Sequence, residues 1–445
     1  MKLESFKEVI EQGKERYGSF TALRNCLVPT HIETVTYEAL YDMIEARVNE
    51  LSEHPAGCVG LYGTTSVEWI VDFFAAPIAG KRTVLLDPTF SRDVIQDRID
   101  EYEIEQILPS NAGFRTCPIK EGDVEYGGYV LLFTSGTTAS NKAVVLSQKA
   151  LCYSAWNGQQ MLACGPEDTI AAMLPLNHVF GLVCTLLWPL SFGASVGIGR
   201  GMRYYTEDPS VYQTTILVTV PTLLNYIYGT ESLNPEIRTV LVGAAPCEQR
   251  VLKAITSLGV QVSFGYGLSE TASGLAISVG SNDPFALELC PDTNLSIAED
   301  GEVLITTPCM MEGYWHRQEE TDQVLIDGVL HTGDLGFLDE QGCLHLQGRK
   351  NDVLVLYNGE KIYCPECEAE LAKELGSEIA LTLLYETLTL VVGEGAEEEM
   401  VRAVVDRYNL HQPISKKIST VRVVEGKLPR TQTGKLQRWK LEEIL

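Results

Sequence analysis

The N-terminal part of the chain alternates two hydrophobic patterns. In TYEALYDMIEARVNEL, residues 36–51, apolar side chains recur at helical spacing, whereas CVGLYG, residues 58–63, is a short apolar run typical of a buried strand. A helix is predicted next over residues 68–79, and the strand TVLLDP after it stops at Pro88. Such alternation predicts a layered α/β lobe with mostly parallel strands.

The same unit recurs further along the chain. TTILVTVP, residues 214–221, and TVLVGAAP, residues 239–246, are apolar runs that flank a predicted helix ending near Gly229. Between the two units, residues 170–199 contain no charged side chain, but prolines and glycines such as Pro189 interrupt them. A membrane span needs about twenty uninterrupted apolar residues. The stretch therefore predicts a buried helix followed by a buried strand, and no membrane span.

The pattern changes near GRKND, residues 348–352. Beyond this point the chain alternates shorter elements. They are a helix over 365–375, the strand-like run 381–394, a helix with Met400, Val401, Val404, Val405 and Tyr408 on one face, and a final strand over 420–425. We predict a large lobe over residues 1–350, a hinge at 349–352, and a small α+β domain over 351–445.

Composition narrows the class of protein. The chain has 445 residues, of which 45% are hydrophobic and 21% charged, as in an ordinary globular protein of two or three domains. Its formal net charge of −26 argues against nucleic acid as a partner, because phosphates would be repelled. The charged N-terminus lacks an apolar signal segment, so we expect a cytoplasmic protein with reduced thiols.

One pair of cysteines has the spacing of a metal or redox site. Cys364 and Cys367 lie in YCPEC. A structural zinc site normally needs a second pair at matching spacing, and the sequence has none. We therefore interpret the pair as part of a helix start with no metal role.

The segment LLFTSGTTASNK, residues 131–142, carries candidate chemistry. An apolar strand leads directly into small hydroxyl residues, a glycine and a lysine. Hydroxyl donors, a close backbone approach and a point charge suit phosphate oxygens. The spacing is not that of a P-loop, and a plain Ser/Thr-rich surface linker would look similar. The candidate phosphate-binding residues are Thr134, Ser135, Gly136, Thr137, Thr138 and Lys142.

Four further segments follow in a fixed order. They are GYGLSET at 265–271, HTGDLG at 331–336, GRKND at 348–352 and LPRTQTGKL at 428–436. Together with TSGTTASNK, this series resembles the signature motifs of the adenylate-forming superfamily, which includes acyl-CoA synthetases, nonribosomal peptide synthetase adenylation domains and beetle luciferases. The resemblance covers most of the chain.

The resemblance implies a nucleotide site for ATP. Tyr266 and Gly267 would border the adenine and Asp334 would accept the ribose hydroxyls, a role that suits a carboxylate. Arg349 would add a ribose or phosphate contact. The segment VGAAP is implied to line the adenine through Gly243, Ala244 and Ala245.

Catalytic roles are also implied by the resemblance. Glu270 would hold Mg²⁺, which prefers oxygen anions, and Thr271 would lie near the α-phosphate. Lys435 would bridge the attacking carboxylate and the ATP, offsetting charge that develops in the transition state. His178 would lie between the acyl pocket and the thiol tunnel, although a lone histidine in an apolar stretch is often a satisfied core residue.

Two motifs depart from the family pattern. Ala139, Asn141 and Ala143 replace glycine, proline and glycine in the phosphate loop, which predicts a stiffer loop and slower closure. Asn351 takes the hinge position where relatives often have Asp or Lys. In the family this hinge lets the small domain rotate between adenylating and thioester-forming poses.

These observations predict an ATP-dependent carboxylic acid:CoA ligase. It would form an acyl-adenylate with ATP and Mg²⁺ and then a thioester with CoA, on a fatty or otherwise apolar acid, which would place it in fatty acid metabolism. One alternative is a stand-alone ligase that loads an acyl or amino acid onto the phosphopantetheine of an acyl carrier protein. The other is a non-catalytic nucleotide-binding relative, motivated by the altered phosphate loop.

Overall fold

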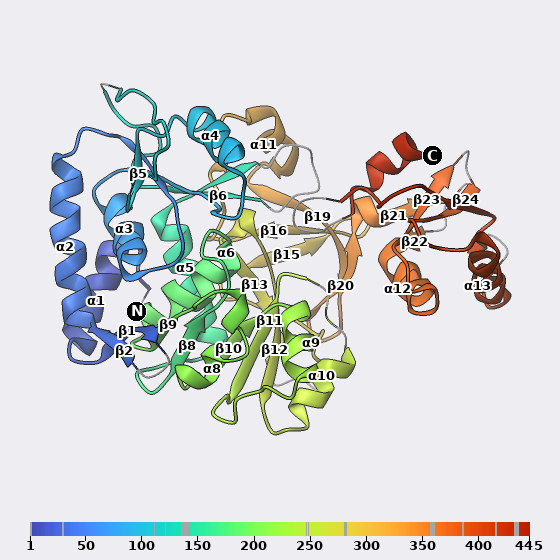
Figure 1. Ribbon diagram of the computed structural model, residues 1–445, viewed down its shortest axis with the longest axis horizontal. Coiled ribbons are helices and arrows are strands. Elements are labelled where there is room, and N and C mark those ends of the chain that lie inside the picture. The colour runs from blue at the N-terminus through green and yellow to red at the C-terminus, as the bar shows by residue number, and fades with distance from the viewer. Residues whose placement is uncertain are drawn as a thin grey trace.

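The structure is a computed structural model. It describes residues 2–28, 31–110, 112–120, 122–134, 142–245, 247, 249–279, 283–356, 361–384, 387–413, 416–430 and 436–445. The described chain forms a large layered body with the C-terminal elements grouped at one side of it (Figure 1).

The largest sheet has nine strands in the order β14-β13-β12-β11-β10-β8-β9-β1-β2. The strands from β12 to β1 pair in parallel, while β2, β13 and β14 are antiparallel additions at the two edges. The bounds are β1 Thr21–Val28, β2 His31–Thr36, β8 Thr169–Ala172, β9 Ser195–Ile198, β10 Ile216–Thr219, β11 Thr239–Gly243, β12 Gln261–Leu268, β13 Ser273–Ile277 and β14 Glu288–Leu289.

A second sheet has six strands in the order β17-β7-β6-β4-β3-β5. Its strands β3, β4, β5 and β6 are parallel, and β7 returns antiparallel beside β6, so that the two strands flank the phosphate loop. The bounds are β3 Cys58–Leu61, β4 Arg82–Leu85, β5 Gln106–Leu108, β6 Val130–Phe133, β7 Ala143–Leu146 and β17 Gly313–Tyr314.

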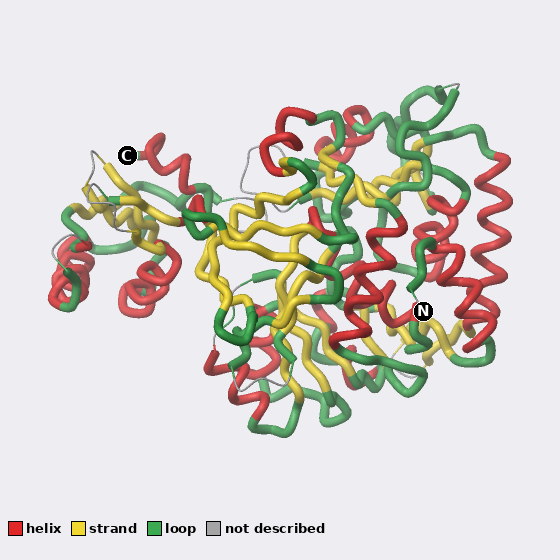
Figure 2. Tube along the Cα trace, turned by 180° about the vertical axis from the view of Figure 1, so that it is seen from behind, coloured by secondary structure: helices red, strands yellow, loops and turns green. Residues whose placement is uncertain are grey.

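Helices pack between and around these sheets. Side chains of α1 Phe6–Tyr17, α2 Tyr37–Glu53, α3 Val67–Ile78 and α5 Gln148–Met161 share one buried core with strands of both sheets. All four helices begin after a capping hydroxyl residue. Ser5, Thr36, Ser66 and Ser147 each accept a hydrogen bond from a backbone N–H three residues on. The tube view shows these helices beside the strands (Figure 2).

The large body has further helical elements. They are α4 Arg92–Glu101, α8 Asp208–Val211, α9 Pro221–Gly229, α10 Gln249–Thr256, α11 Gln318–Val324 and the 3₁₀ turns η2 Met202–Tyr204 and η3 Ser269–Thr271. A third sheet contains β15 Asn294–Ile297, β16 Glu302–Thr306, β18 Leu325–Ile326, β19 Val329–Leu338 and β20 Leu344–Arg349. Its strand β19 carries HTGDLG, and β20 runs directly into the 3₁₀ turn η4 Lys350–Asp352.

Residues 170–199 form neither a regular helix nor a membrane span. After β8, the chain forms α6 Val179–Gly181, the π-helix η1 Leu182–Leu187 and α7 Trp188–Ser191, and then enters β9. The predicted buried helix followed by a buried strand is confirmed, but the helix contains a wide π turn. Among the described residues, no helix is both long and apolar enough to cross a membrane.

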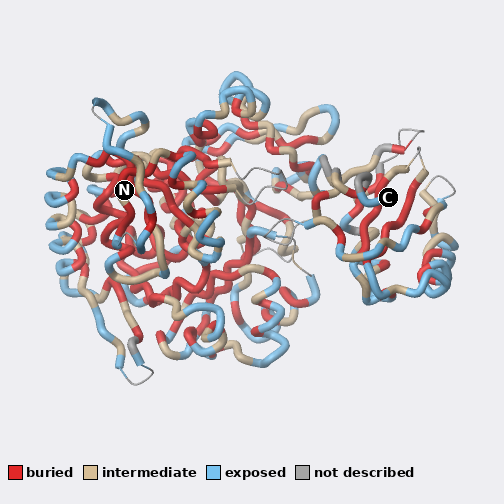
Figure 3. Tube along the Cα trace, turned by 45° about the horizontal axis from the view of Figure 1, so that its top comes forward, coloured by how far each residue is buried: buried red, intermediate tan, exposed pale blue. Residues whose placement is uncertain are grey.

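The C-terminal elements have their own buried core. These elements are β21 Val353–Val355, β22 Lys361–Tyr363, α12 Cys364–Leu375, β23 Ile379–Leu384, β24 Thr387–Val392, α13 Glu398–Leu410 and β25 Thr420–Val423, followed by the 3₁₀ helix η6 Arg438–Ile444. The buried strands and the more exposed helices of this part are distinguished by colour in Figure 3. The hinge at 349–352 stays a prediction.

The predicted α/β fold is confirmed, with one local difference. The strand-like run 381–394 is a hairpin in which β23 and β24 pair antiparallel from Ile379 with Val392 to Leu384 with Thr387. Two polar residues, Tyr385 and Glu386, interrupt the apolar run, and they lie outside the described residues. The run is too long for one strand of a small domain, so the turn could have been predicted.

Candidate active site

The candidate site begins where two parallel strands end side by side. Gly243 at the end of β11 pairs with Gly265 in β12, and Ala244 follows with a φ of 66°. A Cβ on Gly243 would lie 3.0 Å from the carbonyl oxygen of Gly265 and 3.2 Å from the Phe180 ring, so glycine lets the strands approach here. The carboxyl ends of parallel strands are where open α/β sheets bind ligands.

The turn after β12 also depends on a glycine. A Cβ on Gly267 would lie 1.5 Å from the carbonyl oxygen of Ser273, because β12 and β13 shift register at this point. The Thr271 hydroxyl is buried and holds the turn, donating to the Leu268 carbonyl at 3.2 Å and accepting from the Leu268 N–H at 3.2 Å. Residues Ser269–Thr271 thus form a tight 3₁₀ turn that presents Glu270.

Tyr266, Asp334 and Arg349 meet in one network. The Tyr266 hydroxyl donates to Asp334 Oδ2 at 2.6 Å, and Arg349 Nε lies 2.7 Å from Asp334 Oδ1. Burial, followed by the Asp334 carboxylate, raises the pKa of Tyr266 well above its usual value, so the phenol stays protonated. Residues from three motifs, GYGLSET, HTGDLG and GRKND, therefore meet at one carboxylate.

A second network surrounds Glu270. The Tyr314 hydroxyl donates to Glu270 Oε1 at 2.7 Å, and Lys142 Nζ lies 4.6 Å from the centre of the Tyr314 ring. Lys142 also forms a salt bridge of 2.7 Å with Glu320, which lowers the pKa of that carboxyl. Burial and then Glu270 raise the pKa of Tyr314. Lys142 and Glu270, the candidate Mg²⁺ ligand, thus both contact Tyr314.

The phosphate loop itself is only partly described. The Thr134 N–H donates to the Lys142 carbonyl at 2.8 Å, which closes the base of the loop between β6 and β7. Ser135, Gly136, Thr137 and Thr138 lie outside the described residues, as do Ala139 and Asn141. Their phosphate-binding role stays a prediction.

Lys435 also lies outside the described residues, and its catalytic role stays a prediction. The chain on either side of it is well anchored. Arg430 and Leu436 form an isolated antiparallel bridge. Arg438 forms a 2.6 Å salt bridge to Glu368 of α12 and donates to the Leu381 carbonyl at 2.7 Å.

His178 begins the irregular helix that lines an apolar cavity. It precedes α6, and its carbonyl accepts from the Leu182 N–H at 2.9 Å. Its ring is half-buried and engaged with the protein, so both the gating role and the core role remain open.

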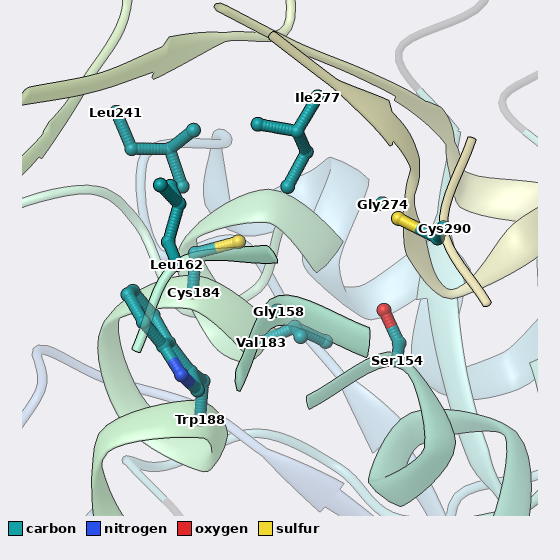
Figure 4. A pocket seen from close by; sticks show the side chains of 10 residues that line it. All are labelled: Ser154, Gly158, Leu162, Val183, Cys184, Trp188, Leu241, Gly274, Ile277 and Cys290. Atoms are coloured by element: carbon teal, nitrogen blue, oxygen red, sulfur yellow. The ribbon is translucent and has the colours of Figure 1, made fainter. Parts of the chain in front are cut away.

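The apolar cavity lies between α5, the η1–α7 segment and the strands β11 and β13. It measures about 20 Å³, enough for one water molecule. Figure 4 shows its walls, with Trp188 at one end and Ser154 and Cys290 at the other. The lining residues are Ser154, Gly158, Leu162, Val183, Cys184, Trp188, Leu241, Gly274, Ile277 and Cys290.

The cavity flanks the strand that carries the nucleotide motif. Ile277 of β13 pairs with Gly265 and Gly274 pairs with Gly267, while Leu241 lies on β11 at the other side of β12. The cavity therefore lies beside β12, the strand that contains Tyr266 and precedes the turn with Glu270. This places an apolar site directly next to a polar one.

Several residues of the site were missed by sequence reasoning. Tyr314 and Glu320 approach Glu270 and Lys142 only through folding, and neither lies in a motif that the sequence singles out. Tyr314 lies on β17, which pairs with β7 in the structure, and the sequence alone gives no signal of this pairing. Ser154 is one serine in an ordinary helix, and no sequence signal distinguishes it.

The donor set fits a magnesium ion held jointly with a nucleotide. Among the described residues, no group of three or more His, Cys, Asp or Glu side chains could bind a metal by itself. Mg²⁺ is typically held by one or two carboxylates together with phosphate oxygens and waters, which a single glutamate beside a phosphate loop satisfies. Cys364 and Cys367 begin α12, and burial raises the pKa of the Cys364 thiol to about 12.

Comparison with known proteins gives the class. Residues 127–315 match the AMP-binding enzyme family. The 2-succinylbenzoate--CoA ligase of Listeria innocua serovar 6a is 26% identical over 92% of this chain and 94% of its own length. That of Geobacillus kaustophilus is 29% identical over 71% of this chain and 69% of its own length.

Solved structures share the fold. The O-succinylbenzoate coenzyme A synthetase of Bacillus subtilis in complex with AMP aligns with a TM-score of 0.82 at 20% identity, over 98% of both chains. An anthranilate CoA ligase in complex with anthranoyl-AMP aligns with a TM-score of 0.80 at 19% identity, over 100% of this chain and 97% of the other.

Fold, motifs and family match together define an AMP-forming acid–thiol ligase. The predicted enzyme class is thereby confirmed, and the non-catalytic alternative is set aside. Residues 127–315 match the AMP-binding enzymes, and the rest of the chain is similar to ligases of the adenylate-forming superfamily in sequence and fold.

Proposed function

We propose that this protein is an ATP-dependent ligase that joins an aromatic carboxylic acid to CoA. The acid carboxylate attacks the α-phosphorus of ATP, which releases pyrophosphate and forms an acyl-adenylate. The CoA thiol then loses its proton and attacks the acyl carbon, and AMP leaves. Both attacking and attacked groups of the first step are anionic, so preorganised positive charge is the main requirement of the site.

The observation that carries the proposal is the position of the apolar cavity. Its walls on β11 and β13 flank β12, and β12 ends in Tyr266 and the turn that presents Glu270. An acyl-adenylate needs such an arrangement, because its acyl and nucleotide halves are joined at one phosphorus atom.

The charged networks suit the nucleotide half. Asp334 has both carboxylate oxygens oriented by Tyr266 and Arg349, and a carboxylate retains lone pairs for two ribose hydroxyls. Lys142 would transfer from Glu320 to the phosphates, and Glu270 would hold Mg²⁺ through the oxygen that Tyr314 does not occupy. A bound Mg²⁺ would neutralise phosphate charge.

The relatives support an aromatic acid over the fatty acid expected from the sequence. Those that span nearly the whole chain are 2-succinylbenzoate--CoA ligases. Their identity of 25–26% supports the reaction class more strongly than the particular acid. Their names also give CoA as the thiol, and no observation favours the phosphopantetheine of a carrier protein.

The remaining roles form part of the proposal. Lys435 would enter the site for adenylation by rotation of residues 351–445 about the hinge at 349–352. His178, at the start of α6, would border the path from the cavity to the thiol. Gly243, Ala244, Ala245 and Gly267 would border the adenine, because their backbone lies at the strand ends.

The test is product analysis with ATP, Mg²⁺, CoA and single acids from a panel of aromatic, fatty and amino acids. We expect AMP, pyrophosphate and an acyl-CoA to form in equal amounts with at least one aromatic acid. Replacing CoA by a holo-carrier protein should abolish thioester formation but not pyrophosphate exchange. Formation of ADP, or a stronger response to long-chain fatty acids, would overturn the proposal.

A further inference from the structure

One buried hydroxyl in the acyl cavity has no hydrogen-bond partner. Ser154 lies on α5 with 3% of its surface exposed, and its Oγ contacts no donor or acceptor among the described residues. Figure 4 shows this oxygen turned into the cavity, toward Cys290 and Gly274. An unpaired buried polar group is destabilising, so a ligand that supplies the missing hydrogen-bond partner binds more tightly.

Other buried hydroxyls on nearby helices donate to a backbone carbonyl of their own helix. Thr185 donates to the Gly181 carbonyl at 2.7 Å, and Ser191 donates to the Leu187 carbonyl at 2.7 Å, each four residues back along its helix. Buried helical serines commonly make this bond. Ser154 does not, which leaves its hydroxyl available toward the cavity.

A second unpaired polar atom lies one helical turn away. Asn157 is fully buried, and its Oδ1 likewise has no partner among the described residues, while its Nδ2 contacts Cys309 Sγ at 3.6 Å. Residues three apart on a helix lie on the same face. Asn157 does not line the cavity, so of these two polar atoms only the Ser154 hydroxyl is exposed to it.

The rest of the described lining carries no charge. It consists of aliphatic and glycine residues, Trp188 and two thiols. Burial raises the pKa of Cys184 and of Cys290 to about 12 each, so both thiols are neutral near pH 7. The Trp188 N–H is already engaged with Gln159 Oε1 at 2.9 Å. A second carboxylate on the substrate would find no cation in this lining, and burying such a charge unpaired is very costly.

Resting on the proposed function, we propose that Ser154 determines specificity for the acid. The acid is a compact aromatic monocarboxylate with an uncharged hydrogen-bonding substituent, such as a hydroxyl or carbonyl group, which pairs with the Ser154 hydroxyl. The substrate class thus differs from 2-succinylbenzoate, which has two carboxylates. The cavity, which measures about 20 Å³, must widen to admit an acyl group, and one ring requires less widening than a long chain.

The experiment compares kcat/KM for benzoate, hydroxybenzoates and 2-succinylbenzoate in acid-dependent pyrophosphate exchange, for the parent enzyme and for Ser154→Ala. We expect the best hydroxybenzoate isomer to exceed benzoate by about tenfold in the parent, the range of one neutral hydrogen bond, and the advantage to disappear in the variant. 2-Succinylbenzoate should be at least about a hundredfold poorer than that isomer.

Ser191→Ala is the matched control. It removes an equally buried hydroxyl from the neighbouring helix, but Ser191 does not line the cavity. This variant should keep the parent's ratio of hydroxybenzoate to benzoate and the parent's KM for ATP. A loss of the ratio in both variants would show a general packing effect and would overturn the role of Ser154.

The outcomes separate the inference from the function on which it rests. Activity with aromatic acids in which 2-succinylbenzoate is preferred, or in which Ser154→Ala leaves the substituent preference intact, overturns the inference and leaves the ligase proposal standing. Lack of exchange with every acid, while the protein is folded and binds ATP, overturns the function itself and the inference with it.

Discussion

The two halves of the candidate site satisfy their polar groups in opposite ways. In the nucleotide half, the described carboxylates of Asp334, Glu270 and Glu320 each contact a donor from another element of the fold. In the acyl cavity, the single hydroxyl of Ser154 contacts none. The first half is preorganised before ligand binds, whereas the second leaves one contact for its ligand to complete.

This difference assigns separate tasks to the two halves. In the proposed function, the preorganised set of charges would hold ATP and Mg²⁺, which are the same for every acid. An incompletely paired apolar cavity discriminates among acids, because a buried unpaired hydroxyl penalises a ligand that cannot reach it. Variants of the first half should therefore alter the reaction with all acids, and variants of the second should alter the choice of acid.

The largest expected effect comes from Glu270→Gln. Removing the negative charge should lower acid-dependent pyrophosphate exchange by about 10²- to 10³-fold for every acid, because the Mg²⁺–phosphate contact is lost. Tyr314→Phe is the control, since it removes the hydrogen bond to Glu270 but keeps the carboxylate, and should cost about tenfold or less. An equal loss of exchange in both variants would show that the hydrogen bond between Tyr314 and Glu270 matters and that the negative charge does not.

Asp334→Asn should have the next largest effect. Its carboxylate is oriented by Tyr266 and Arg349, and the loss of charge-assisted bonds to the ribose should raise the KM for ATP by about ten- to a hundredfold. The KM for the acid should change by less than about twofold. If steady-state kinetics gave a similar rise in both KM values, the two halves would not be separable.

Gly274→Val tests whether the cavity binds the acyl group, because it fills the cavity from the wall that faces Ser154. A Cβ on Gly274 would meet no atom within 4 Å, so the added methyl groups enter open space in the lining rather than the backbone. We expect kcat/KM for ring-containing acids to fall by about tenfold or more, with the KM for ATP unchanged. Gly274→Ala should give a smaller fall in the same direction, and a gain in activity would contradict the placement of the acyl group.

The smallest effect concerns pH. Glu302 accepts from the Gly333 N–H at 2.9 Å and from Lys350 at 3.1 Å. Burial opposes ionisation of this carboxyl, but these two donors outweigh it and its pKa falls below the usual 4.5. The stability that it contributes is present above about pH 4.5 and is lost as the pH falls through the lower folded pKa.

In Glu302→Gln, the free energy of unfolding should therefore fall less steeply between about pH 5 and pH 3 than in the parent, with a difference of less than about 1 kcal/mol. The contact between Glu302 and Gly333 lies beside Asp334. Losing it should therefore weaken ATP binding and leave the choice of acid unchanged. An unchanged pH profile in differential scanning fluorimetry would show that the Gly333 turn does not depend on this carboxylate.

The contrast between the halves also explains what sequence could predict. The α/β layers, the irregular buried stretch and the order of motifs follow from local patterns, and Tyr266 and Asp334 could be named because a motif surrounds each. Tyr314, Glu320 and Ser154 belong to no motif, and their roles arise from tertiary contacts between distant segments. The sequence predicts a fatty or otherwise apolar acid, because local sequence does not report the size or the unpaired hydroxyl of a cavity.

A crystal structure with a non-hydrolysable hydroxybenzoyl-adenylate analogue tests the central claim most directly. The account predicts the ribose on Asp334 and the adenine beside Gly243 to Ala245. It predicts the ring in the cavity between α5 and the strands β11 and β13, with its hydroxyl within hydrogen-bonding distance of Ser154 Oγ. A ring bound outside this cavity, with the nucleotide in the predicted place, would contradict the assignment of the acyl site.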